Sequence, residues 1–168
     1  MFIGIRKITV FLSLSALLAL LPACAQTDGE YQEALRRINE AADRGATSLT
    51  LENLVLQALP PEIGNLASLT RLYLNENQLT ALPPEIGNLA NLRGLSLEGN
   101  QLTALPPEIG NLANVRGLSL EANQLTALPP EIGNLANLTF LGLGGNLLPS
   151  DYPIELPDLL AYLREQGE

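Results

Sequence analysis

Residues 69–91 read LTRLYLNENQLTALPPEIGNLAN, and the unit returns as LRGLSLEGNQLTALPPEIGNLAN at 92–114 and as VRGLSLEANQLTALPPEIGNLAN at 115–137. The step from one copy to the next is 23 residues. A fixed period of this length is typical of repeat proteins, whose units cannot bury their own apolar faces and therefore stack on their neighbours. The sequence predicts a solenoid of stacked coils.

The first part of each unit has the spacing of a short strand. Leu72 and Leu74 are two residues apart, so in an extended segment both point to the same side, and Arg71 and Tyr73 point to the other. Stacking places the leucines in the core. The residues between them become columns on the exposed, concave face of a parallel sheet.

The second part of each unit brings the chain back to the next strand. Two successive prolines, Pro83 and Pro84, fix φ and end the strand, and Gly87 allows a tight or positive-φ turn before Leu89 returns to the core. We expect an irregular or short-helical convex side. Each unit then buries about six aliphatic side chains, at roughly 1.5–3 kcal/mol each.

An asparagine recurs at the turn after each expected strand. A buried amide at this position can donate to and accept from the backbone of adjacent coils, so it satisfies groups that would otherwise lack partners. We interpret this column as structural, because buried polar side chains in proteins are hydrogen-bonded. Its members are Asn77, Asn100, Asn123 and Asn146.

The spacing L-x-x-L-x-L-x-x-N-x-L, followed by LPPEIGNL, resembles the leucine-rich-repeat proteins over roughly residues 46–148. This resemblance implies an α/β fold, a short right-handed horseshoe of about five coils with a parallel sheet on its concave face. It also implies a non-enzymatic module for protein interaction. It does not name a partner, because function depends on the site and not on the fold.

Both ends of the repeat carry helical patterns. Residues 25–45 predict an N-terminal capping helix that starts at a capping box, Thr27 to Glu30, and ends at Gly45. Residues 149–168 predict a C-terminal capping helix, with apolar positions at 156, 159, 160 and 163. Since caps cover sheet edges that would otherwise pair between molecules, we expect a monomer.

Residues 1–24 have the layout of a secretory signal peptide. Arg6 and Lys7 precede a mostly apolar run that is too short for a comfortable membrane span. The ending Leu21-Pro22-Ala23-Cys24 resembles the lipobox of bacterial lipoproteins, although Pro22 is atypical, and acylation would explain the only cysteine. We expect lipidation at Cys24 and attachment to the membrane of a bacterial cell envelope. Cleavage after Ala25, giving a soluble periplasmic or secreted protein, stays open.

The charge of the chain limits its partners. The formal net charge is −9, and because Arg6 and Lys7 lie in the leader, seven basic residues face 18 acidic ones after Cys24, a formal charge of −11. Such a chain lacks the basic stripe that nucleic acid requires, and an anionic bilayer would repel it. We therefore expect contact with a membrane only through a lipid anchor, and no nucleic-acid partner.

The composition also argues against catalysis. With no histidine and one cysteine, Ser-His-Asp and Cys-His sites and the usual zinc sites are excluded, and no phosphate loop or dinucleotide motif is present. Glu98 and Glu121 fall on adjacent strands, but Arg93 and Arg116 lie in the same coils, which indicates a solvated charge ladder. We predict no enzyme activity, no cofactor and no metal site.

Binding is expected on the concave face. Aligned coils predict a shallow trough floored by Gly94 and Gly117, with an Arg column on one side, a Glu column on the other and two aromatic side chains toward its ends. We expect a protein segment or another extended polymer to lie there. The predicted ligand-binding residues are Arg71, Tyr73, Arg93, Ser96, Glu98, Arg116, Ser119, Glu121 and Phe140.

Two other functions are open at this stage. The chain could be a non-catalytic subunit or an effector remnant of a larger enzyme system, or a purely structural protein of the envelope. Identification of a partner captured by the concave face would separate these alternatives from an interaction module.

Overall fold

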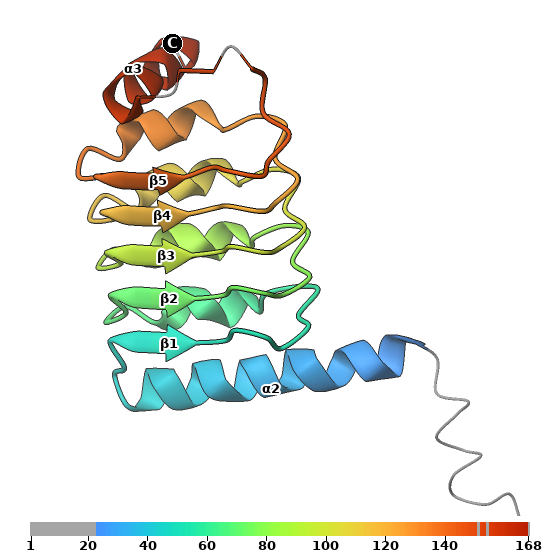
Figure 1. Ribbon diagram of the computed structural model, residues 1–168. Helices are drawn as coiled ribbons and strands as arrows, with labels where there is room; N and C mark the ends of the chain where they lie inside the picture. Colours follow the sequence, from blue (N-terminus) through green and yellow to red (C-terminus); the bar gives the residue numbers. More distant parts are fainter. Residues whose placement is uncertain (1–22, 151, 154, 168) are drawn as a thin grey trace, which may run out of the picture.

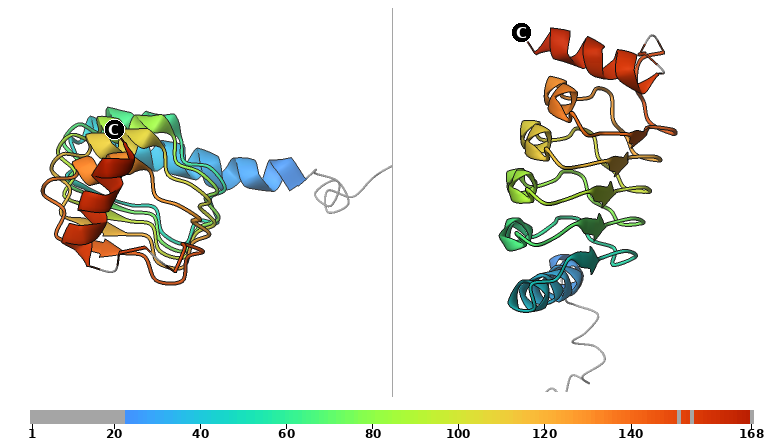
Figure 2. Two further views of the ribbon diagram at one scale, coloured as in Figure 1. Left: turned by 90° about the horizontal axis from the view of Figure 1, so that it is seen from above. Right: turned by 90° about the vertical axis from the view of Figure 1, so that its left-hand side faces the viewer.

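The computed structural model describes residues 23–150, 152–153 and 155–167, with side chains from residue 29 onward. The chain begins with helix α2 (Ala23–Asp43), continues through five coils and ends with helix α3 (Leu156–Gln166). Each coil contributes a strand of three residues to one side of the solenoid, and short 3-10 helices lie on the other (Figure 2). The strands are β1 (Ser48–Thr50), β2 (Arg71–Tyr73), β3 (Gly94–Ser96), β4 (Gly117–Ser119) and β5 (Phe140–Gly142), and the 3-10 helices are η1 (Pro61–Asn65), η2 (Pro84–Asn88), η3 (Pro107–Asn111) and η4 (Pro130–Asn134).

The five strands form one parallel sheet in the order β1-β2-β3-β4-β5 (Figure 1). Partners across the sheet are always 23 residues apart, as in Leu72 with Leu95 and Leu95 with Leu118. The register is therefore the sequence period itself. The predicted α/β leucine-rich-repeat solenoid, with a helix at each end, is confirmed.

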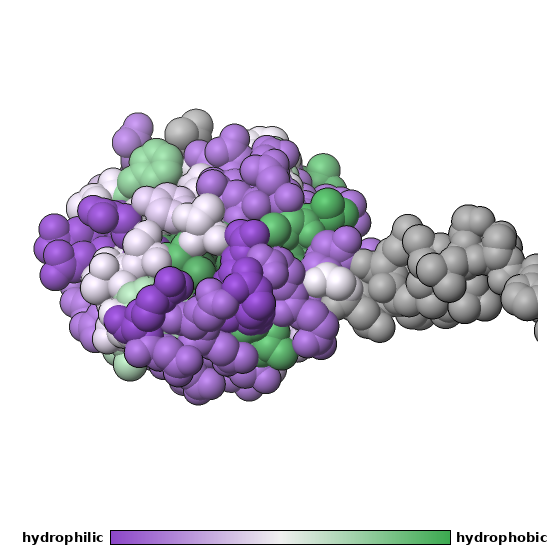
Figure 3. All heavy atoms as spheres, turned by 90° about the horizontal axis from the view of Figure 1, so that it is seen from below, coloured by the Kyte–Doolittle hydropathy of each residue, from purple (hydrophilic) through white to green (hydrophobic). Residues whose placement is uncertain are grey.

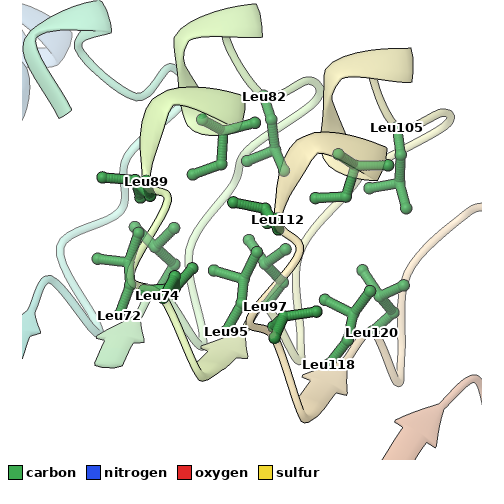
Figure 4. Close-up of a cluster of buried hydrophobic side chains, with 14 of the residues drawn as sticks. Leu72, Leu74, Leu82, Leu89, Leu95, Leu97, Leu105, Leu112, Leu118 and Leu120 are labelled. Atoms are coloured by element: carbon green, nitrogen blue, oxygen red, sulfur yellow. The ribbon is translucent and has the colours of Figure 1, made fainter. Parts of the chain in front are cut away.

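The core lies between the sheet and the 3-10 layer. Leu72 and Leu74 point from β2 and the residue after it toward Leu82 and Leu89 of the returning chain, and each later coil repeats the arrangement (Figure 4). Leu72, Leu74 and Leu89 have no exposed surface. Since the same side chains recur in adjacent coils, each leucine packs against residues of its own coil and against the equivalent leucine of the next coil. Stacking therefore buries apolar surface that a single unit would leave exposed.

The glycine of each PEIGN turn is required for a different reason from the predicted one. Gly87 does not have a positive φ. A Cβ on Gly87 would instead lie 2.6 Å from the carbonyl oxygen of Glu108 in the next coil, and one on Gly110 would lie 2.6 Å from that of Glu131. These glycines allow adjacent 3-10 helices to approach each other closely.

Positive φ values occur elsewhere in the unit, at the residue before the column asparagine or, in the first coil, before Leu54, which replaces it. In all five coils this residue is left-handed, although only two of the five are glycine. Glu76 (φ 54°) and Ala122 (φ 52°) therefore hold a conformation that costs a residue with a Cβ about 1 kcal/mol or more. The five residues are Asn53, Glu76, Gly99, Ala122 and Gly145.

Helix α2 caps the first coil. Its buried side chains, Ala34, Ile38 and Ala41, lie in its second half and face the first coil. Seen from the α2 end, the molecule presents a mostly hydrophilic surface (Figure 3). The helix begins at Ala23 rather than at the predicted capping box, so Thr27 is inside it. After Pro22 the sequence offers alanine and glutamine, which favour helix, so nothing stops the helix from starting earlier.

The exposed side of α2 holds a small ion-pair network. The carboxylate of Glu33 lies 2.8 Å from Arg36 Nη2 and 2.7 Å from Arg37 Nε, and Arg36 also pairs with Glu40. Hydrogen bonds donated by Arg36 and then by Arg37 lower the pKa of Glu33 from its ordinary value of 4.5 to about 2. The hydrogen bonds that Arg36 donates to Glu33 and Glu40 raise its own pKa.

Helix α3 covers the other end less completely. It packs against η4, burying Leu159, Leu160 and Leu163, with Pro157 in its first turn and Gly167 as its C-cap. In the last coil, however, Leu141 and Leu143 are only half-buried, unlike their copies in the inner coils. A hollow of about 320 Å³ lies between them and residues such as Tyr152 and Leu156. The cap therefore leaves part of the last coil open.

Most of the predicted signal peptide, residues 1–22, lies outside the described residues. Ala23 and Cys24 lie in the first turn of α2, and the side chain of Cys24 is outside the description. Within the part of the chain that the structure describes, no helix combines the length and the apolar composition needed to cross a membrane.

Candidate functional site: the concave face of the sheet

The column asparagines form a buried ladder that joins consecutive coils. Asn123 Nδ2 donates to the carbonyl oxygens of Leu97 (2.9 Å), Leu120 (3.0 Å) and Glu121 (3.2 Å), and its Oδ1 accepts from Leu102 N (3.0 Å). Asn77 and Asn100 make equivalent bonds. Asn146, which is half-buried, binds Leu125 N and the carbonyl oxygens of Leu120 and Leu143. The geometry assigns these side chains to the framework, since each uses its polar atoms on backbone groups.

A second asparagine ladder was missed by the sequence interpretation. Asn114 Nδ2 donates to Ala90 O at 2.8 Å, and Asn91 and Asn137 make the same bond to Ala67 and Ala113. These side chains are exposed and lie at the turn that enters each strand. The Asn that recurs in the LAN segment of each unit was the available signal.

Two columns of side chains stand on the concave face, as the alternation of the strands predicts. In the first, Arg71 is paired in register with Gly94, Gly94 with Gly117 and Gly117 with Phe140. In the second, Tyr73 is followed by Ser96, Ser119 and Gly142. The centre of the sheet is therefore floored by glycine and serine, with larger side chains on β2 and β5.

These columns enclose a shallow hollow of about 230 Å³ over β2 to β5. A Cβ added to Gly94 or Gly117 would meet no atom within 4 Å, so the space above the floor is open. Phe140 at one end is 54% exposed and Tyr73 at the other is half-buried. The residues that line the hollow are Arg71, Tyr73, Gly94, Leu95, Ser96, Gly117, Ser119 and Phe140.

Hydrogen bonds fix the polar edge of this hollow. Ser96 Oγ donates to Asn75 Oδ1 at 2.7 Å, and Asn75 Nδ2 donates to Glu52 Oε1 at 2.7 Å. In the next coil Ser119 Oγ donates to Glu121. The carboxylate of Glu121 occupies the place that a side chain on Gly142 would take, because a Cβ there would lie 1.9 Å from Glu121 Oε1. The serines of the second column thus orient the polar side chains at the edge of the hollow, and Gly142 leaves room for the carboxylate of Glu121.

The charged residues of the face flank the strands. Arg93, Arg116, Glu98 and Glu121 lie outside the lining of the hollow, and they do not pair with one another: among the described residues the ion pairs are confined to α2. Each Arg precedes its strand and each Glu follows it, so about 16 Å of extended chain separates them. The Arg and Glu side chains therefore form two separate columns and, among the described residues, no Arg–Glu ion pair joins them.

The described part of the chain contains no group of three or more His, Cys, Asp and Glu side chains arranged to hold a metal ion. Four of the carboxylates, Glu62, Glu85, Glu108 and Glu131, stand in the first turns of the 3-10 helices on the convex side. They belong to the turns and are remote from the concave hollow.

Comparisons with known proteins agree with this architecture. The family model described as leucine rich repeat matches residues 44–102 and 90–148. No curated protein matches the chain in sequence. Among solved structures, the leucine-rich-repeat protein LIC12759 of Leptospira interrogans is similar at 39% identity with a TM-score of 0.61, over 68% of this chain and 35% of that one.

The functional domain of InlJ from Listeria monocytogenes is also similar, at 27% identity and a TM-score of 0.57, over 67% of this chain and 23% of that one. That domain includes a cysteine ladder, which this chain, with one cysteine, does not share. The chain spans about a third and about a quarter of these two structures, so their likeness concerns the repeat and not the whole proteins. With the family model covering more than half of its residues, the chain belongs to the leucine-rich-repeat family.

Proposed function

We propose that this protein is a non-enzymatic interaction module that binds an extended protein segment across the concave face of its sheet. The observation that carries the proposal is the open hollow between Tyr73 and Phe140. Leucine-rich repeats commonly bind proteins, and aromatic and Arg side chains are the usual energetic anchors of interfaces. An exposed Phe beside an empty glycine floor is apolar surface that a partner would cover.

The module acts as a monomer in this proposal. Support comes from both ends, where α2 packs on η1 and α3 on η4, so that each terminal coil has a helix against it. An interaction face that stays free of a second copy remains available to the partner.

The proposed location is the bacterial cell envelope, with Cys24 acylated. The support is the Leu-Pro-Ala-Cys sequence at 21–24 and the absence of any other cysteine. The first part of α2 extends past the coils (Figure 1), and from Ala23 to Tyr31 a helix rises about 12 Å. This segment would hold the acidic solenoid away from an anionic bilayer, which a short flexible tether would not do.

The concave site is tested by capture from an envelope extract, followed by affinity measurement with the captured protein. Tyr73→Ala and Phe140→Ala should each weaken binding about tenfold or more, since each removes an anchor, with the melting temperature unchanged. Glu85→Ala, on the convex side, is the control and should leave binding intact. Loss of binding in the control alone would place the site on the other face.

The anchor is tested by metabolic labelling with a fatty acid and by fractionation of cells. The wild-type protein should carry label and sediment with membranes, whereas Cys24→Ser should be unlabelled and soluble, since more than one acyl chain gives stable attachment. An unlabelled wild-type protein would favour cleavage after Ala25 instead.

A further inference from the structure

Three arginines of the concave side stand without acidic partners among the described residues. Arg71, Arg93 and Arg116 are exposed, and no hydrogen bond or ion pair of their guanidinium groups joins them to another described side chain. Arg36 and Arg37 of α2, in contrast, both bind Glu33. Since the chain has 18 acidic residues and nine basic ones, the lack of partners on this face does not come from a shortage of carboxylates.

The three arginines come from adjacent coils at the start of their strands. Arg93 and Arg116 hold the same position in adjacent coils, about 4.8 Å apart along the solenoid, and Arg71 is in register with Gly94, the residue after Arg93. Like charges in such positions repel. In the coils of Arg93 and Arg116, Glu98 and Glu121 follow the strands instead of preceding them, and Ser119 donates a hydrogen bond to Glu121 beside Gly142. The arginines therefore form one positive edge on an otherwise acidic chain.

This positive edge borders the hollow. Arg71 lines the hollow itself, together with the glycine floor and the two aromatic side chains, while Arg93 and Arg116 each directly precede one of its floor residues, Gly94 and Gly117. The volume of about 230 Å³ accommodates one large side chain. A segment that fills the hollow therefore lies next to Arg71 and beside the starts of β3 and β4, which Arg93 and Arg116 precede.

From this arrangement, and resting on the proposed function, we infer that the partner segment is acidic and carries a large apolar side chain beside its carboxylates. The apolar side chain enters the hollow between Tyr73 and Phe140. Adjacent Asp or Glu side chains bind Arg71, Arg93 and Arg116, whose planar forks match carboxylates. The pairing removes the repulsion within the arginine edge, so the charge complementarity selects the partner.

Selection from a displayed library of random peptides gives an unbiased test. Peptides that bind the protein but not its Phe140→Ala variant should be enriched in Asp or Glu next to Trp, Tyr, Phe or Leu. Enrichment of Lys or Arg, or of uncharged peptides, would overturn the inference while leaving a concave site in place. Peptides that do not distinguish Phe140→Ala from wild type would contradict the proposed function itself.

The most enriched peptide then serves as the probe in fluorescence anisotropy. Arg93→Glu and Arg116→Glu should each weaken its binding at least about tenfold, with the effect reduced at high salt. Arg44→Glu makes the same change in net charge at the end of α2 and should change binding less than about twofold. If Arg44→Glu weakens binding as much as Arg93→Glu, only overall charge matters and the arginine edge is not a site.

A reversal of charge on both sides makes the test specific. The double variant Arg93→Glu, Arg116→Glu should bind a peptide in which Lys replaces the acidic residues, and should bind it better than the wild-type protein does. If the double variant does not bind the Lys peptide better than wild type does, while Tyr73→Ala and Phe140→Ala still weaken binding of the acidic peptide, the hollow is the binding site and the arginines do not contribute to it. A neutral oligosaccharide that binds and is insensitive to Arg93→Glu would equally overturn the acidic peptide as partner.

Discussion

The convex and concave faces of this solenoid use the same residue in opposite ways. On the convex side, Gly110 is confined, because a Cβ would lie 2.6 Å from the backbone oxygen of Glu131 in the next coil. On the concave side, Gly117 is seven residues further on and has no atom within 4 Å of where its Cβ would be. Gly110 is needed because adjacent coils approach each other closely, whereas Gly117 leaves open space in which a partner can bind.

The difference explains why the faces vary differently along the chain. All four PEIGN turns are identical, and each packs against at least one other such turn, whereas the concave columns change from Arg71 to glycine to Phe140. A close-packed position is determined by its neighbours. At an open position, the residue type can instead be selected by contact with a partner.

The largest expected effect comes where the chain turns from the concave to the convex face. Asn123→Ala removes four hydrogen bonds to backbone groups, which then lie unpaired in the core, and should cost about 3 kcal/mol of unfolding free energy. Glu98→Ala, exposed at the edge of the open face, should cost under about 0.5 kcal/mol. Urea unfolding of both variants measures the difference, and equal losses would contradict the division into packed and open positions.

Alanine at the two glycines tests the comparison directly, because the effects should have opposite signs. Gly110→Ala forces the backbone of adjacent coils apart and should cost about 2 kcal/mol. Gly117→Ala meets no neighbour and restricts the unfolded chain, so it should add about 0.5 kcal/mol to stability. Thermal unfolding of the matched pair gives both values. Destabilisation by both variants would mean that the concave floor is also constrained by packing.

The smallest expected effect lies outside both faces, in the ion pairs of α2. The pKa of Glu33 is lowered to about 2 in the folded chain, so its pairing stabilises the fold above about pH 4.5 and is lost as the pH falls toward 2. Glu33→Gln should therefore lower stability slightly at neutral pH and not at all near pH 2, because exposed ion pairs contribute little. Urea midpoints at the two pH values test this. If Glu33→Gln lowers the free energy of unfolding more than Gly110→Ala does, the ion pairs of α2 contribute more to stability than the packing between coils.

Most of the framework was predictable because it follows from two periods. The 23-residue step sets the sheet register, and the alternation of residues such as Leu72 and Tyr73 decides which side chains point out. The columns of the candidate site follow from those two facts. They required no knowledge of distances.

What could not be predicted depends on distances between coils and on side-chain conformations. The role of Gly87 was misassigned because its neighbour, Glu108, is in another coil, and the pattern does not show how close coils approach. Glu121 was placed in a charge ladder, but its side chain turns to Ser119 and the space over Gly142. Even the left-handed residue before each asparagine was hidden, because Glu76 and Ala122 occupy it as well as glycine.

The two asparagine ladders also determine how such a molecule can change its length. Their bonds join residues 21, 24 and 26 positions apart, and each separation holds only while the unit keeps 23 residues. A residue inserted between coils must bulge out of the coil, or it displaces the bonds that span it. Duplication of a whole unit would recreate all of them and widen the sheet by about 4.8 Å. The solenoid can therefore lengthen only by whole 23-residue units. Duplication of a coil would extend the sheet for a longer partner and leave the existing contacts unchanged.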